Sequence, residues 1–91
     1  MLLIVRRLIV HLTRVYILMN KNASQLQIKF GEKVRKERMK RGLSQEKLGF
    51  ETGLDRTYIS GIERGERNPS LNNIGKIAKA LRVPLNELFS F

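Results

Sequence analysis

Residues 43–65, which read LSQEKLGFETGLDRTYISGIERG, constrain the fold of this chain more than any other segment. Ser44 and Asp55 are residue types that cap helix N-termini, and each precedes a segment of helical length. Gly53 lies between the two segments, where glycine adopts a left-handed turn at little steric cost, and Gly65 ends the second segment. The pattern predicts two short helices that are joined by a tight glycine turn and pack across each other.

Helical periodicity continues upstream of this pair, and no strand pattern or internal repeat interrupts it. Ser24 is a typical N-cap residue, and Gly42 is a typical residue for ending a helix. Between them runs an apolar stripe at helical spacing, formed by Leu26, Phe30, Val34 and Met39. The segment therefore predicts a helix that begins after Ser24 and ends at Gly42.

The downstream part is helical by the same criteria. Ser70 precedes a second apolar stripe, formed by Leu71, Ile74, Ile77, Ala78 and Leu81. Pro84 is favourable in the first turn of a last helix, which carries Leu85, Leu88 and Phe89. We therefore expect an all-α fold, a compact bundle of five short helices around one core, over residues 24–41, 44–52, 55–64, 70–81 and 84–89.

Composition limits the function classes. The chain has 91 residues, enough for one small domain, and a formal charge of +10 from 18 Lys and Arg against 8 Asp and Glu. This basic excess favours a polyanionic partner, either nucleic acid or an anionic membrane surface. The absence of cysteine excludes disulfides and thiolate metal sites and fits a reducing cytoplasm. A lone histidine, His11, cannot hold a metal, and no carboxylate pair or phosphate-binding glycine loop occurs, so we expect no enzyme, no cofactor and no metal site.

Residues 1–23 form an N-terminal extension to a domain over residues 24–91. The extension is strongly apolar, but it is interrupted by Arg6, Arg7, His11 and Arg14. These interruptions argue against both a transmembrane span and a signal peptide. The last three share one face of a helix, which could lie on a membrane surface or pack against a partner. Alternatively, Met19 is the native start, and the preceding residues are upstream sequence.

The second helix of the central pair has an apolar side for its scaffold and a polar, basic outer side. Such a helix can lie in the DNA major groove, which makes the pair a helix-turn-helix. Arg56 can donate two hydrogen bonds to guanine O6 and N7, and Thr57 can place its methyl group on thymine. Tyr58 could also read DNA or could be a packing residue, and Gly61 would allow close approach of the backbone. The candidate base-reading residues are Arg56, Thr57, Tyr58, Ser60 and Gly61.

A second set of side chains could contact DNA phosphates. Gln45 begins the first helix of the pair, where its amide and the helix dipole both favour a phosphate. Basic residues near the pair could clamp the DNA backbone on either side. The candidate phosphate-binding residues are Gln45, Lys47, Arg64 and Arg67.

Residues 30–89 resemble the phage-repressor and Cro type of helix-turn-helix domain, also called the Xre-like family. The resemblance rests on the matching spacing of Gln45, Leu48, Gly53, Ile59, Ile62, Glu63 and Gly65. Residues 54–64 are similar to the recognition segment of restriction–modification controller proteins. Two features depart from the pattern: Gly49 replaces the usual alanine, and residues 1–18 have no counterpart.

The resemblance implies a lambda-repressor-like bundle in which Arg38 pairs with Glu63. It also implies a small dimeric regulator that binds palindromic double-stranded DNA upstream of its own gene. The bound protein would either recruit or block RNA polymerase, and no small-molecule ligand is expected.

The C-terminal part has more apolar surface than one short helix can hide internally. We therefore expect the dimer interface to include Val83, Leu85, Leu88, Phe89 and Phe91. Alternatively, the two phenylalanines close the core of the monomer.

Other classes of regulator share this domain type. An antitoxin-type or phage-type repressor with a protein partner is the nearest alternative, and residues 1–18 would then bind the partner. A membrane-associated regulator would use the same segment. RNA binding is less favoured, because the four phenylalanines lie at apolar or terminal positions and form no exposed stacking platform.

Overall fold

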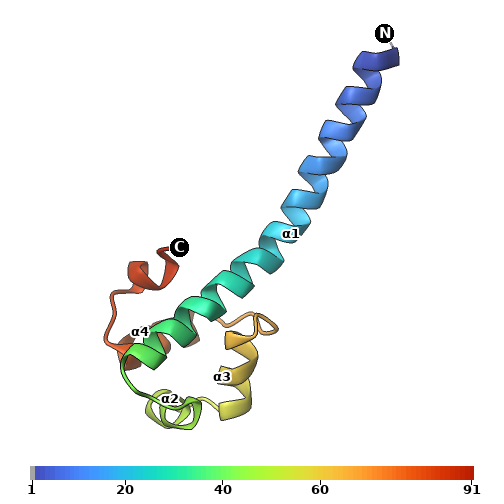
Figure 1. Cartoon of the computed structure of the whole chain (residues 1–91). Helices are drawn as coiled ribbons and strands as arrows, with labels where there is room; N and C mark the ends of the chain where they lie inside the picture. The colour runs from blue at the N-terminus through green and yellow to red at the C-terminus, as the bar shows by residue number, and fades with distance from the viewer. Residues whose placement is uncertain (1) are drawn as a thin grey trace.

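The computed structural model describes the backbone of residues 2–91 and the side chains of residues 2–10, 12 and 25–91. This part of the chain holds four α-helices and one short 3₁₀ helix: α1 (Leu2–Lys40), α2 (Gln45–Thr52), α3 (Arg56–Glu63), α4 (Leu71–Leu81) and η1 (Leu85–Phe89). The C-terminal part of α1 packs against the other helices, and its N-terminal part extends away from them (Figure 1). The expected all-α bundle of five helices is confirmed, although the last helix is a 3₁₀ helix.

The first helix is much longer than expected, because it begins at Leu2 rather than after Ser24. No proline or glycine occurs between Leu2 and Phe30, so nothing in this segment breaks a helix. At a rise of about 1.5 Å per residue, 39 residues span about 58 Å, which accounts for most of the 61 Å length of the molecule. Of the expected basic stripe, Arg7 is exposed, and the side chains of His11 and Arg14 lie outside the described residues.

The described side chains of residues 2–10 and 12 are all exposed, and most of them are apolar. Among the described residues, no helix combines the length and the apolar character needed to cross a membrane.

At the N-termini of α2, α3 and α4, two of the three predicted capping residues make the expected side-chain hydrogen bond. The Ser44 hydroxyl accepts from the Lys47 N–H at 3.0 Å, and the Ser70 hydroxyl accepts from the Asn73 N–H at 3.2 Å. Asp55 stands at the N-cap of α3 but makes no side-chain cap, because its carboxylate accepts from the Thr57 hydroxyl instead. Gly53 ends α2 with a φ of 73°, in the left-handed conformation that its position predicted.

The core lies between α1, α2, α3, α4 and η1. It consists of Phe30, Val34, Leu48, Ile59, Ile62, Ile77, Ala78, Leu81 and Leu88. Three residues that the apolar stripes placed inward are instead exposed, namely Leu26, Met39 and Leu71. Leu71 is the first residue of α4 and Met39 the last but one of α1, so both stand at helix ends.

The buried carboxylate of Glu37 lies beside this core and pairs with Lys33 at 3.4 Å and Lys40 at 3.5 Å. Burial acts to raise the pKa of Glu37, but the two ammonium groups together outweigh it, so that its pKa lies below the usual range. Glu37 is therefore held as an anion inside the C-terminal part of α1.

The structure corrects part of the expected dimer interface. Leu88 is fully buried in the core and offers no surface to a partner, whereas Val83 packs against the core and is only partly buried. Val83 lies between α4 and η1, and Leu88 lies within η1, which packs against α1. Leu85, Phe89 and Phe91 are exposed, although Phe89 also stacks on Phe30 with ring centroids 5.2 Å apart.

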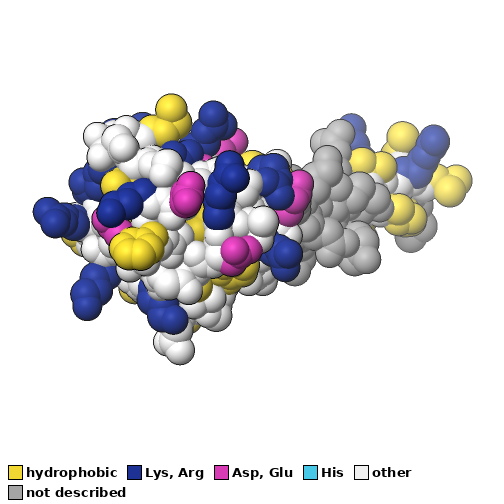
Figure 2. All heavy atoms as spheres, turned by 90° about the horizontal axis from the view of Figure 1, so that it is seen from below, with side chains coloured by type: hydrophobic (Ala, Val, Ile, Leu, Met, Phe, Trp, Pro, Cys, Tyr) yellow, Lys and Arg dark blue, Asp and Glu magenta, His cyan; other side chains and the backbone are white. Residues whose placement is uncertain are grey.

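Basic side chains dominate the surface below α2 and α3. Figure 2 views the molecule from this side and shows Lys and Arg side chains spread across the face, with fewer acidic groups between them. A polyanion that approaches from this side meets mostly positive charge.

Candidate nucleic-acid interface

One face of α3 and the start of α2 enclose an open hollow of about 240 Å³, which we call the α3 hollow. It is lined by Gln45, Arg56, Thr57, Ser60 and Arg64. The helical repeat explains this set, because the four α3 and post-α3 residues are spaced to share the side opposite Ile59 and Ile62. Those two isoleucines are buried in the core and hold α3 with its polar side outward.

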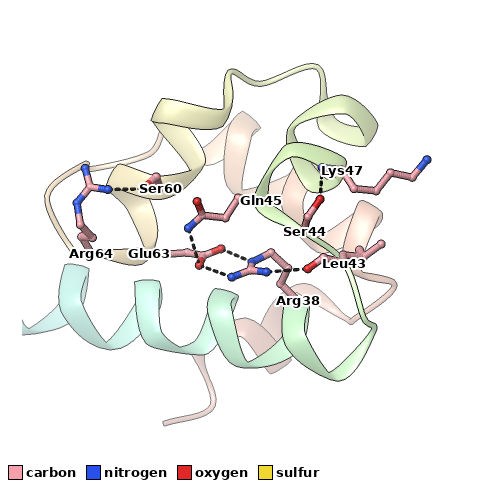
Figure 3. A network of polar contacts seen from close by, with 8 residues as sticks. All are labelled: Arg38, Leu43, Ser44, Gln45, Lys47, Ser60, Glu63 and Arg64. Atoms are coloured by element: carbon pink, nitrogen blue, oxygen red, sulfur yellow. Dashed lines mark hydrogen bonds and ion pairs between the residues drawn. The ribbon is translucent and has the colours of Figure 1, made fainter.

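A buried ion pair supports the hollow from beneath (Figure 3). The Arg38 Nε donates to Glu63 Oε2 at 2.7 Å, and its Nη2 donates to Glu63 Oε1 at 3.0 Å. The Nη1 group donates to the Leu43 carbonyl oxygen at 2.6 Å. The pair that the resemblance implied is therefore present, and it links α1, the α1–α2 turn and α3.

Gln45 extends this network to the edge of the hollow. Its Nε2 donates to Glu63 Oε1 at 3.2 Å, so the side chain is held rather than free in solvent (Figure 3). An amide nitrogen carries two N–H groups, and the second remains for another acceptor. Gln45 is also the first residue of α2, where the helix dipole favours an anion.

The arginines of the α3 hollow differ in their freedom. Arg64 is tied down, because its Nη1 donates to the Ser60 hydroxyl and its Nη2 pairs with Glu66 at 3.1 Å. Hydrogen bonding and attraction from Arg64 hold the pKa of Glu66 below its usual range. The Arg56 side chain is exposed, and its guanidinium makes no hydrogen bond or ion pair within the described part of the chain. Its guanidinium is therefore available to an incoming ligand.

Two candidate base-reading residues do not line the hollow. Tyr58 packs against the core, and its hydroxyl accepts from Asn73 Nδ2 at 3.1 Å. Gly61 is buried under the side chain of Arg67. Successive helix residues are rotated by about 100°, so that both positions fall on the flanks of α3 rather than on the side of Arg56.

The remaining phosphate candidates lie outside the hollow. Lys47 is exposed on α2, with its ammonium group 5.2 Å from the ring centroid of Phe50. Arg67 follows α3 and lies along its flank beside Gly61. Sequence reasoning missed Asn73 and Glu66, which hold Tyr58 and Arg64, because both are ordinary polar residues that meet their partners only through the fold.

Comparison with known proteins identifies the family. The family model described as helix-turn-helix matches residues 34–88, which include all of α2, α3 and α4. The chain belongs to the helix-turn-helix family. This family membership agrees with the resemblance carried by the residues from Gln45 to Gly65.

Relatives of this helix-turn-helix chain include restriction–modification controller proteins. Control protein C.BamHI of Bacillus amyloliquefaciens is 55% identical over 69 residues, which are 75% of this chain and 85% of the relative. The crystal structure of controller protein C.AhdI from Aeromonas hydrophila has 54% sequence identity and a TM-score of 0.68, and covers 69% of this chain and 96% of its own. A second structure is that of controller protein C.Esp1396I as a tetramer in complex with its natural 35 base-pair operator. It has 41% sequence identity and a TM-score of 0.66, and the match covers 70% of this chain and 84% of that one.

Proposed function

We propose that this chain is a sequence-specific, double-stranded DNA-binding transcription regulator that acts in the cytoplasm and controls its own gene, as controller proteins do. The DNA-binding unit is the domain of residues 24–91. One observation carries the proposal: the free guanidinium of Arg56 shares the α3 hollow with the N-terminus of α2. The buried network of Arg38, Glu63 and Gln45 holds both elements in place.

Base reading falls to the side of α3 that lines the hollow. Arg56 donates two hydrogen bonds to a guanine in the major groove, and Thr57 and Ser60 contact neighbouring base edges. Asp55 holds the Thr57 hydroxyl, which leaves the Thr57 methyl group to face the base. Tyr58 acts from the flank, where Asn73 orients its hydroxyl.

Phosphate contacts flank the base-reading residues. Gln45 meets a phosphate with its second amide N–H, and the dipole of α2 adds to the attraction. Lys47, Arg64 and Arg67 supply positive charge around this point. These contacts set the register of α3 on the duplex and make the affinity dependent on salt.

DNA binding by a single short helix is weakly selective, so the regulator acts as a two-fold dimer on half-sites about one helical turn apart. As its concentration rises, the dimer fills its best site first and neighbouring sites later. The bound protein then recruits or blocks RNA polymerase at its own promoter.

Replacing Leu85 by aspartate should convert the dimer to a monomer. Leu85, Phe89 and Phe91 are all exposed, so a charge at position 85 would be buried unpaired in an interface that uses these residues. Sedimentation of the wild type at micromolar concentration should give a dimer, and the variant a monomer. Phe50→Asp is the control, because Phe50 is 80% exposed on α2 and the dimer should persist. A monomeric wild type would contradict the dimer proposal.

The central test compares DNA affinities of the wild type and Arg56→Ala. At about 0.15 M salt, the wild type should prefer DNA from upstream of its own gene over scrambled DNA by about 10³-fold or more. Arg56→Ala should lose about 1–3 kcal/mol of that discrimination, because a bidentate guanine contact is removed. The measurement is a fluorescence anisotropy titration of both DNAs.

Arg35→Ala is the matched control for this titration, because it removes the same charge from an exposed position on α1 outside the α3 hollow. It should leave the preference for upstream DNA intact. Equal, salt-sensitive binding of both DNAs by the wild type would mean that charge alone binds DNA, and it would contradict the proposed function.

A further inference from the structure

The side chain of Arg67 lies directly against the backbone of Gly61. A Cβ atom added at Gly61 would lie 2.5 Å from Cγ, 3.4 Å from Nε and 3.5 Å from Cδ of Arg67. The arginine stem therefore occupies the space that any larger residue at position 61 would need. Gly61 is buried, and the stem of Arg67 lies over it.

The main chain holds the two residues together as well. The Gly61 carbonyl oxygen accepts from the Glu66 N–H at 2.9 Å and from the Arg67 N–H at 3.2 Å. These bonds fold the segment after α3 back onto the helix, so that Arg67 starts beside Gly61. Gly61 thus fixes both where the Arg67 side chain begins and the path that its stem follows.

The guanidinium of Arg67 stands at the end of this path without a hydrogen bond to any described side chain, although its charge adds to that of Arg64 in lowering the pKa of Glu66. The residue is exposed, and its guanidinium makes no hydrogen bond or close ion pair with any side chain in the described part of the chain. Arg64, in contrast, is held by Ser60 and Glu66. Gly61 follows Thr57 by one helical turn, so the stem of Arg67 runs along the flank next to the base-reading residues.

We infer that Gly61 is a positioning residue, whose missing side chain seats Arg67 along α3 and directs its guanidinium to a DNA phosphate beside the α3 hollow. This inference rests on the proposed DNA binding. It replaces the base-reading role expected for Gly61 with an indirect one. A seated arginine loses less side-chain freedom on binding than a solvated one, which favours the phosphate contact.

The test is a double-mutant cycle of the wild type, Gly61→Ala, Arg67→Ala and the double variant. Affinity for upstream DNA is measured over a range of salt concentrations. Gly61→Ala should weaken binding by about two- to tenfold, the effect of immobilising a flexible side chain, and should reduce the salt slope by about one phosphate contact. Arg67→Ala should do at least the same. The double variant should bind no more weakly than Arg67→Ala, because the stem that the new methyl group displaces is already gone.

A control and a second readout separate positioning from folding. Gly75→Ala adds the same methyl group in α4, where it meets nothing within 4 Å, and should leave DNA affinity unchanged. Unfolding free energies of the four proteins form a second cycle, in which Gly61→Ala should destabilise the fold only when Arg67 is present. This second cycle tests the contact even if Gly61→Ala alone folds poorly.

Two results would overturn the inference but not the proposed function. One is unchanged binding by Gly61→Ala. The other is an equal loss of affinity from Gly61→Ala in the presence and absence of Arg67. In either case the wild type would still select its upstream DNA. A wild type that failed to select this DNA would overturn the proposed function and the inference together.

Discussion

Arg38→Ala is expected to lower the free energy of unfolding by about 3–5 kcal/mol, the range for breaking a buried ion pair. The side chain of Arg38 is 12% exposed and that of Glu63 only 3% exposed. Removing the guanidinium leaves a buried carboxylate with Gln45 as its remaining hydrogen-bond donor, and it leaves the Leu43 carbonyl oxygen without its arginine partner. Urea unfolding at neutral pH, followed by circular dichroism, measures the loss.

Lys40→Ala is the matched control for this experiment. This substitution also removes a positive charge from the end of α1 and an ion pair, but the Lys40 side chain is 58% exposed. Glu37 is buried, but it keeps Lys33 as a partner when Lys40 is removed, and the lost partner is largely in solvent. This variant should therefore lose only about 0–1 kcal/mol. An Arg38→Ala protein as stable as Lys40→Ala would show that the pair does not hold the helices together.

Arg38→Ala should also weaken specific DNA binding in the protein that remains folded. Glu63 would lose the partner that fixes its carboxylate, and Gln45 is held through that carboxylate. Stability and recognition are therefore coupled through one group.

Gly31→Ala should be nearly as damaging, with a loss of about 3 kcal/mol, at the upper end for overpacking of a core. Gly31 is buried where α1 crosses the end of α3. A methyl group there would overlap the Ile62 carbonyl oxygen and lie 2.9 Å from the Glu63 carbonyl oxygen. Both atoms belong to the backbone of α3, so the clash is relieved only by moving the two helices apart. Thermal and urea unfolding would measure the effect.

Helix propensity alone would predict that Gly31→Ala stabilises the protein. Alanine is favoured over glycine in a helix interior by about 1 kcal/mol. Gly75→Ala should show this gain, because α4 leaves that position open to solvent. Equal stabilisation by both substitutions would contradict the close crossing of α1 and α3.

Local signals in the sequence predicted the central helix pair because their physical causes are local. Ser44 caps α2 with its own hydroxyl, Gly53 turns left-handed, and the spacing of Ile59 and Ile62 places them on one side of α3. Each of these features depends on residues within one or two helical turns. The prediction that the first helix begins after Ser24 was wrong, because a capping residue does not end a helix that no upstream glycine or proline interrupts.

The sequence predicted which residues share the outer side of α3, but it did not predict which residues bordering that side would be covered. The spacing of Arg56, Thr57 and Ser60 placed them on the outer side of α3, where the structure brings them together with Gln45. The same spacing could not show that α4 would cover Tyr58 or that the segment after α3 would cover Gly61. Both positions border the outer side, and a border residue is exposed or covered according to what packs beside it.

By itself, then, the sequence determined the helix-turn-helix, its polar outer side and the basic charge of the chain, since these follow from residue type and helical repeat. Only the tertiary structure decided that Leu88 belongs to the core, that Gly61 lies beneath Arg67 and that a side chain at position 31 would meet the backbone of α3. These outcomes depend on contacts between segments distant in sequence. A lone glycine within a helix carries no local sign of the backbone that crosses it, so its role becomes visible only when α3 is in place.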